Sequence, residues 1–199
     1  VILKGRNRNI PANLIEEKEL QSLYENYPNT DYISKRNKVI TGLFIYQAIT
    51  REELEKLKPE HLLLSKAKII VPPTNKNNQR TIPVNAIQIS DITEYLQLIR
   101  PELMKQHNIK TDKLFFGTKG STSIRGSLSY IYKTINRINP EIKDAKQIRM
   151  SVISNKLKTK NLRKVQYFAG HKWVSSTERY KLNNIEDLKK EINKYHPLR

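Results

Sequence analysis

Apolar residues recur every three or four positions along most of the chain, which is the spacing of one buried helix face. A mixed apolar run over Lys38–Tyr46 predicts a helix that is buried on most sides. We expect helices to begin near Asn13, at Asp91 and at Asn161, because such side chains cap helix N-termini. The predicted buried stripes are Leu14, Leu20 and Leu23; Leu54 and Leu57, in a helix from about Thr50 to Lys58; Ile92, Leu96 and Ile99; Leu128, Ile131, Ile135 and Ile138; Ile148, Val152, Ile153 and Leu157; and Leu162, Val165 and Phe168.

Between residues 68 and 84, the helical spacing of apolar residues gives way to short β-branched runs. Two short β-branched runs, Lys68–Val71 and Arg80–Val84, are separated by a polar and basic segment that begins with two prolines. This pattern predicts an antiparallel hairpin with a polar tip. The sequence therefore predicts a mainly α domain with a small antiparallel β-sheet, an α+β fold.

The two ends of the chain differ from the rest. Residues 1–13 are polar and basic and contain Gly5 and Pro11, a composition typical of a linker. Near the other end, the segment Asn184–Tyr195 carries isoleucine and leucine at helical spacing. We expect this segment to form a helix with one apolar face.

Composition narrows the classes of partner. The 199 residues contain 37 Lys and Arg against 19 Asp and Glu, a formal net charge of +18. Such an excess favours a polyanion, because basic side chains that contact phosphates release counterions. The absence of cysteine excludes disulfides and thiolate metal sites. The longest apolar runs are far too short to span a bilayer, so we expect a nucleic acid as partner and no membrane. A generic RNA-binding protein fits this composition as well.

An ordered set of residues between 146 and 180 carries the candidate chemistry. Arg149 follows Lys146 by three positions, and Tyr180 follows the pair Gly170-His171 after a turn rich in serine and threonine. A tyrosine phenol can attack a DNA phosphate, provided that cations stabilise the negative charge of the transition state. Arginine suits this role because its planar fork donates two hydrogen bonds to phosphate and keeps its charge. The chemistry needs no metal and no cofactor.

This arrangement resembles the catalytic signature of the tyrosine recombinases, the phage-integrase family. The family phrase of Gly-His, a few small polar residues and then Tyr matches residues 170–180 in order and distance. Lys146-x-x-Arg149 is similar to the family's His-x-x-Arg motif, with lysine at the histidine position. Residues 80–84 resemble the family's Arg-x-Val-Pro-Leu strand.

The resemblance implies a role for each matched residue. Tyr180 would be the nucleophile, and Arg149 and His171 would donate hydrogen bonds to the scissile phosphate. Lys146 would keep the positive charge of the histidine it replaces. Lys76, at the predicted hairpin tip, would reach the leaving 5′ oxygen.

One expected arginine is missing. The family's first catalytic arginine lies in a phrase like Tyr-Thr-Gly-Leu-Arg-x-x-Glu-Leu, and this chain aligns with it through Tyr46 and Glu53. That alignment places Thr50 at the arginine position, with Arg51 one residue later. A shift of one residue on a helix turns a side chain by about 100°. Either another cation, such as Arg51 or Lys58, reaches the phosphate, or the domain is a weakened or inactive relative.

The resemblance also implies organisation and partners. Residues 1–13 would link to an upstream DNA-clamping domain, and residues 14–199 would form the catalytic domain. Its terminal helix 184–195 would pack on a neighbouring protomer or on its own domain. The expected partners are double-stranded DNA, other protomers of a tetramer and accessory DNA-bending proteins, in the cytoplasm on a bacterial nucleoid.

The implied reaction is site-specific strand exchange through a 3′-phosphotyrosyl intermediate, in the service of a mobile element. Two alternatives stay open. One is a DNA-binding accessory or regulatory protein on the same fold, which Thr50 favours. The other is a relaxing topoisomerase that shares the tyrosine chemistry.

Overall fold

Helices make up most of the domain. The computed structural model describes residues 13–117 and 121–180 of the chain. Its mainly helical character confirms the predicted α+β class. The helices are α1 (Glu17–Glu25), α2 (Tyr32–Gln47), α3 (Arg51–Lys56), α4 (Ala86–Glu94), α5 (Arg100–Gln106), α6 (Arg125–Ile138), α7 (Ala145–Thr159) and α8 (Leu162–Ala169), with 3₁₀ turns at Pro59–His61 and Leu64–Lys66, a π-helical segment at Tyr95–Ile99 between α4 and α5, and a further helical stretch over residues 175–180.

A small sheet carries the predicted hairpin. Strands β1 (Leu62–Leu63), β2 (Lys68–Val71) and β3 (Arg80–Pro83) pair antiparallel in the order β1-β2-β3. The hairpin of β2 and β3 confirms the prediction, although β3 ends one residue earlier than expected. The sequence did not predict β1, because two residues are too few to show alternation.

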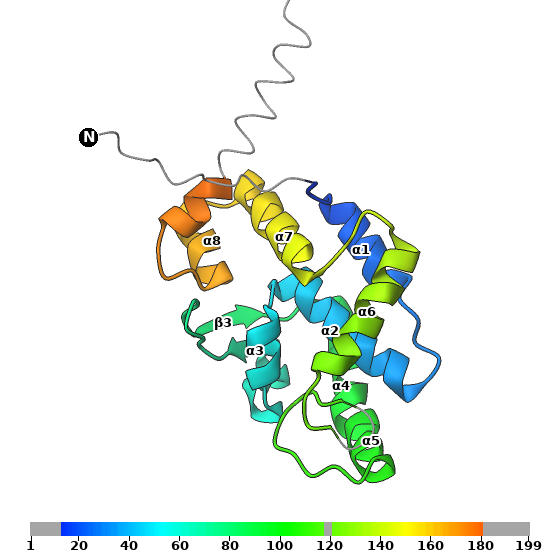
Figure 1. Ribbon diagram of the computed structural model, residues 1–199. Coiled ribbons are helices and arrows are strands. Elements are labelled where there is room, and N and C mark those ends of the chain that lie inside the picture. Colours follow the sequence, from blue (N-terminus) through cyan, green and yellow to red (C-terminus); the bar gives the residue numbers. More distant parts are fainter. Residues whose placement is uncertain (1–12, 118–120, 181–199) are drawn as a thin grey trace, which may run out of the picture.

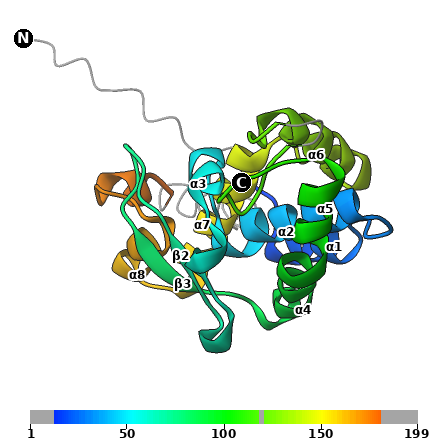
Figure 2. The same cartoon turned by 90° about the horizontal axis from the view of Figure 1, so that it is seen from below.

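Helix α2 lies in the middle of the molecule, and α7 packs against it (Figure 1). The sheet and α8 lie on one side of them, and α1, α4, α5 and α6 lie on the other, as the view from below also shows (Figure 2). The hydrophobic core surrounds α2, whose Ile40, Leu43 and Phe44 are fully buried. This explains why α2 reads as a mixed apolar run and not as a one-sided stripe.

Two of the three predicted helix starts are corrected by the structure. Asn13 has a left-handed backbone with φ of 55°, and α1 begins after it, at Glu17, where the Glu16 amide donates to the Glu19 carboxylate at 3.0 Å. Asp91 lies inside α4, whose N-cap is Asn85, and accepts a hydrogen bond from the Tyr24 hydroxyl at 2.6 Å. The third start is confirmed, since the Asn161 side chain caps α8.

The predicted linker, apart from residue 13, and the predicted helix 184–195 lie outside the described residues. Within the described ranges, no helix is both long and apolar enough to cross a membrane.

Candidate active site

A cleft of about 770 Å³ lies between α3, the β2–β3 hairpin tip, the start of α7 and the turn after α8. The structure brings the residues predicted from the sequence together around it. Lys58, the other candidate cation, is instead paired with Asp112 at 2.7 Å and does not line the cleft. The predicted residues that line it are Thr50, Arg51, Lys76, Lys146, Arg149, His171 and Tyr180.

Tyr180 forms part of the cleft wall. It lies at the end of the helical stretch 175–180, and its side chain packs with Ile153, Val165 and Ala169 in a small apolar cluster between α7 and α8. Only 3% of its surface is exposed. Its ring stacks on that of His171, with the ring centres 6.2 Å apart. The phenol is therefore held in a fixed position by packing.

His171 is buried as a neutral imidazole. Its Nδ1 lies 2.8 Å from the hydroxyl oxygen of Thr177, which is itself fully buried. Burial lowers the pKa of His171 to about 3, and the charges of Arg149, Arg179 and Arg80 lower it in the same direction. A neutral imidazole carries one ring proton and so can donate one hydrogen bond.

Gly170 allows the chain to turn into His171. It ends α8 with φ of 71°, a conformation that suits glycine. A Cβ there would also lie 2.6 Å from Nη1 of Arg80 and 3.0 Å from the carbonyl oxygen of Asn78. The Gly170 carbonyl accepts a hydrogen bond from the Asn78 amide at 2.8 Å. The turn is thus fastened to the hairpin that carries Lys76.

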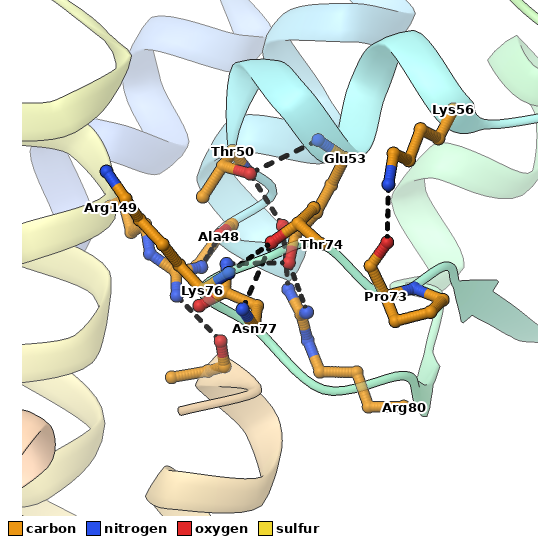
Figure 3. A network of polar contacts seen from close by, with 11 residues as sticks. Ala48, Thr50, Glu53, Lys56, Pro73, Thr74, Lys76, Asn77, Arg80 and Arg149 are labelled. Carbon is orange, nitrogen blue, oxygen red and sulfur yellow. Dashed lines mark hydrogen bonds and ion pairs between the residues drawn. The ribbon is translucent and has the colours of Figure 1, made fainter. Parts of the chain in front are cut away.

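Arg149 points from α7 into the site (Figure 3). Its guanidinium donates hydrogen bonds to the carbonyl oxygens of Ala48 and Ala169, the second at 2.6 Å. Ala48 ends α2 in a left-handed conformation, with φ of 50°. Burial lowers the pKa of Arg149 to about 10, so the group stays cationic at neutral pH.

A buried ion pair that the sequence did not predict lies next to the cleft (Figure 3). Arg80, on β3, donates to both carboxylate oxygens of Glu53, on α3, at 2.6 and 3.1 Å. Asn77, in the hairpin tip, donates to the same carboxylate at 2.9 Å. Alternation along β3 was the available signal, because Arg80 shares an inward face with Ile82.

Four predicted residues remain, and they differ in their surroundings. Arg51 is exposed in the first turn of α3. Thr50 caps α3: its hydroxyl accepts from the Glu53 amide at 3.2 Å, and its own amide donates to the Glu53 carboxylate at 2.8 Å. Lys76 is exposed at the hairpin tip, next to the tethered Asn77. Lys146 is exposed in the first turn of α7.

Two further cleft residues were not singled out from the sequence. Arg179 precedes Tyr180, and Trp173, the only tryptophan of the chain, follows His171 by two positions and is 73% exposed. Both lie within the segment that carries the motif. In the described part of the chain, no group of three or more His, Cys, Asp or Glu side chains is arranged to hold a metal ion.

The fold is that of tyrosine recombinase catalytic domains. The XerA recombinase superposes with a TM-score of 0.70 at 19% identity, covering 94% of this chain and 64% of that one. The XerH site-specific recombinase, bound to palindromic difH substrate in a post-cleavage complex, gives 0.72 at 22% identity, with 92% and 52% covered.

Sequence comparison defines the family. The model of the phage integrase family matches residues 13–186, and the chain belongs to that family. It is 32% identical to tyrosine recombinase XerC of Natranaerobius thermophilus over 96% of this chain and 65% of the relative. It is 27% identical to XerC of Rickettsia bellii, with 98% and 63% covered. The chain thus spans less than two thirds of the length of these relatives.

Proposed function

We propose that this protein is a site-specific DNA recombinase that cuts and rejoins strands through a 3′-phosphotyrosyl intermediate. One observation carries the proposal: a single cleft gathers the Tyr180 phenol and the side chains that would hold the phosphate, from three separate parts of the fold. They come from the hairpin tip (Lys76), from α7 (Lys146 and Arg149) and from the turn after α8 (His171). A phenol among phosphate-binding donors is the arrangement that in-line attack on a phosphodiester requires.

In the proposed reaction, the Tyr180 phenol loses its proton to solvent as its oxygen attacks phosphorus, and a tyrosyl–phosphate ester forms as the bond to the 5′ oxygen breaks. Arg149 donates to the non-bridging oxygens, where negative charge accumulates. Lys76 gives a proton to the departing oxygen, which leaves as a 5′-hydroxyl. The 5′-hydroxyl of a partner strand then gives its proton to Lys76 and attacks the ester, which restores a phosphodiester and frees Tyr180 to regain a proton from solvent. No net hydrolysis occurs.

His171 acts in this scheme as a neutral hydrogen-bond donor. Its low pKa excludes a standing positive charge at neutral pH. We assign the ring proton to Nε2, because the Thr177 hydroxyl at Nδ1 can donate to that nitrogen. Nε2 is then free to donate to a phosphate oxygen, and Thr177 fixes the tautomer.

The partners follow from the same proposal. They are double-stranded DNA, which the net charge of +18 favours, and further protomers of a tetramer joined through residues 184–195. We further propose that the protein acts with accessory DNA-bending proteins, that it serves a mobile element and that it works in the cytoplasm on the nucleoid.

A DNA-binding protein without cleavage activity is the second candidate. It is favoured by Thr50, whose hydroxyl and amide are both engaged in capping α3 and which brings no positive charge to the cleft. On this alternative the protein binds DNA through its basic surface, and Tyr180 is a packing residue.

Covalent trapping separates the two candidates. The probe is a pool of labelled duplexes with randomised sequence and a nick close to the position of attack, so that the short 5′-hydroxyl fragment is lost and the adduct persists. We expect an adduct that survives denaturant and is absent with Tyr180→Phe, which removes one hydroxyl and leaves the ring packing intact. Tyr167→Phe is the matched control, because Tyr167 lies on α8 outside the cleft.

DNA binding without any adduct would contradict the recombinase proposal. Recovery of an adduct in Thr50→Arg alone would show a fold that has lost one catalytic cation and is otherwise competent.

A further inference from the structure

Arg179 lies beside the proposed nucleophile. Its guanidinium carbon is 5.3 Å from the centre of the Tyr180 ring, within cation–π range. Consecutive helical residues point about 100° apart, so this contact requires the arginine side chain to fold back over the ring. Arg179 is exposed, and both residues line the cleft. The guanidinium is therefore held at the cleft while it stays accessible to a ligand.

The charge of Arg179 acts on the proposed phosphate-binding groups. After burial itself, the charges of Arg149 and Arg179 are the next largest influences that lower the pKa of His171. Burial also raises the pKa of Tyr132, and the charge of Arg51 opposes that rise. The charge of Arg179 thus acts on His171, whereas that of Arg51 acts on Tyr132.

Two other arginines near the site are committed elsewhere, whereas Arg51 lines the cleft without a carboxylate partner among the described residues. Arg80 is paired with Glu53, and Arg125 with Glu55. Two donors of Arg149 are taken by backbone carbonyl oxygens, out of the five that a guanidinium offers. Among the described residues, no carboxylate pairs with Arg179. One available guanidinium therefore lies next to the phenol, and Thr50 contributes none.

We propose that Arg179 is a catalytic residue that binds the scissile phosphate and supplies the guanidinium that is missing at position 50. The inference rests on the proposed recombinase function and names the group that completes its site. Negative charge on the non-bridging oxygens increases as Tyr180 attacks. A second guanidinium therefore stabilises the transition state more than it stabilises the complex with uncleaved DNA.

The test measures adduct formation by Arg179→Ala, Arg179→Lys, Arg51→Ala and Arg163→Ala on one nicked duplex enriched from the randomised pool. Arg163 is an exposed arginine of α8 outside the cleft and serves as the control. At saturating protein, we expect Arg179→Ala to lower the rate by about 100-fold or more. Arg179→Lys should fall in between, since lysine keeps the charge but loses the fork. Arg51→Ala should lose less than Arg179→Ala, and Arg163→Ala should match the unchanged protein.

A second substrate distinguishes phosphate binding from a structural role. In the same duplex, a methyl group replaces one non-bridging oxygen of the scissile phosphate and removes its charge. If Arg179 stabilises that charge, Arg179→Ala cleaves this substrate at nearly the rate of the unchanged protein. An equal loss on both substrates would mean that the substitution merely displaces Tyr180, and the inference would be wrong.

The remaining outcomes are also decisive. An unchanged rate for Arg179→Ala on the charged phosphate, or a larger loss for Arg51→Ala, overturns the assignment but leaves the recombinase function standing. No adduct from the unchanged protein on any duplex that it binds overturns the proposed function, and the inference with it. Noncovalent binding of each variant is measured on the same duplex by fluorescence anisotropy, so that affinity and chemistry are separated.

Discussion

Replacing Glu53 by glutamine should destabilise the domain more than any other single charge removal near the cleft. The Glu53 carboxylate is fully buried and accepts four hydrogen bonds, two from Arg80 and one each from the Asn77 side chain and the Thr50 amide. Burial raises the pKa of Glu53, but the hydrogen bonds and charge of Arg80 outweigh it and lower this pKa. The pair is therefore ionised at neutral pH.

The size of the effect follows from what Arg80 loses. Glu53→Gln keeps the shape of the side chain but leaves the guanidinium of Arg80, only 2% exposed, without an anion. Removing one partner of a buried pair costs about 3–5 kcal/mol. The new amide group also turns a donor toward Asn77 or Arg80, which adds about 1 kcal/mol. The sum is a large part of the roughly 5–15 kcal/mol by which domains are stable.

Urea unfolding followed by circular dichroism measures this cost. Glu55→Gln is the matched control, because Glu55 lies on the same helix and pairs with the exposed Arg125, so its loss should cost only a small fraction as much. The double variant Glu53→Gln, Arg80→Met should recover part of the stability, since no unpaired charge remains. If Glu53→Gln costs no more than Glu55→Gln, the reasoning about the buried pair is wrong.

Two further predictions concern the cleft itself. His171 has a folded-state pKa of about 3 against an ordinary value of 6.5, so its contribution to stability is complete above pH 6.5 and is lost as the pH falls toward 3. At pH 5, the unfolding free energy of the unchanged protein should therefore have dropped by about 2 kcal/mol more than that of His171→Gln. Urea titrations across pH measure this difference, and parallel pH profiles of the two proteins would contradict the prediction. Trp173 is the only tryptophan of the chain, lines the cleft and is 73% exposed. DNA that enters the cleft should therefore change the tryptophan emission at the same protein concentrations at which the anisotropy of labelled DNA rises. Saturated binding without any change in emission would mean that DNA binds elsewhere.

Most of the helices could be predicted because each buries one apolar face, and the period of that face is visible in the sequence. The first turns of α2 could not be predicted, because they bury polar side chains. Arg36 is 1% exposed and donates to the Phe116 carbonyl oxygen at 2.9 Å, and Asn37 accepts from Arg36. Because Phe116 is distant from Arg36 in the chain, their contact leaves no local pattern in the sequence. The predicted helix therefore began too late, at Lys38.

The same distinction holds for the candidate site. The proximity of His171 and Tyr180 was implied by the resemblance to the family motif, and the turn and the short helix that join these two residues are local. The Glu53–Arg80 pair joins a helix to a strand, and only the inward register of β3 hinted at it. Whether any of these side chains is catalytic stays a prediction until adduct formation is measured.

The surroundings of Arg149 show how the buried Glu53–Arg80 pair affects the charge of the cleft. Its guanidinium is nearly buried, and its pKa of about 10 corresponds to a cost of about 3 kcal/mol at neutral pH for keeping the charge. A neighbouring carboxylate would remove that cost, and Glu53 is close enough to act on Arg149 electrostatically. Because Arg80, Asn77 and Thr50 occupy the oxygens of Glu53, however, that carboxylate makes no direct bond to Arg149. On the proposed function, this positive charge would act on a DNA phosphate, and binding of the phosphate would offset the cost of burying the charge.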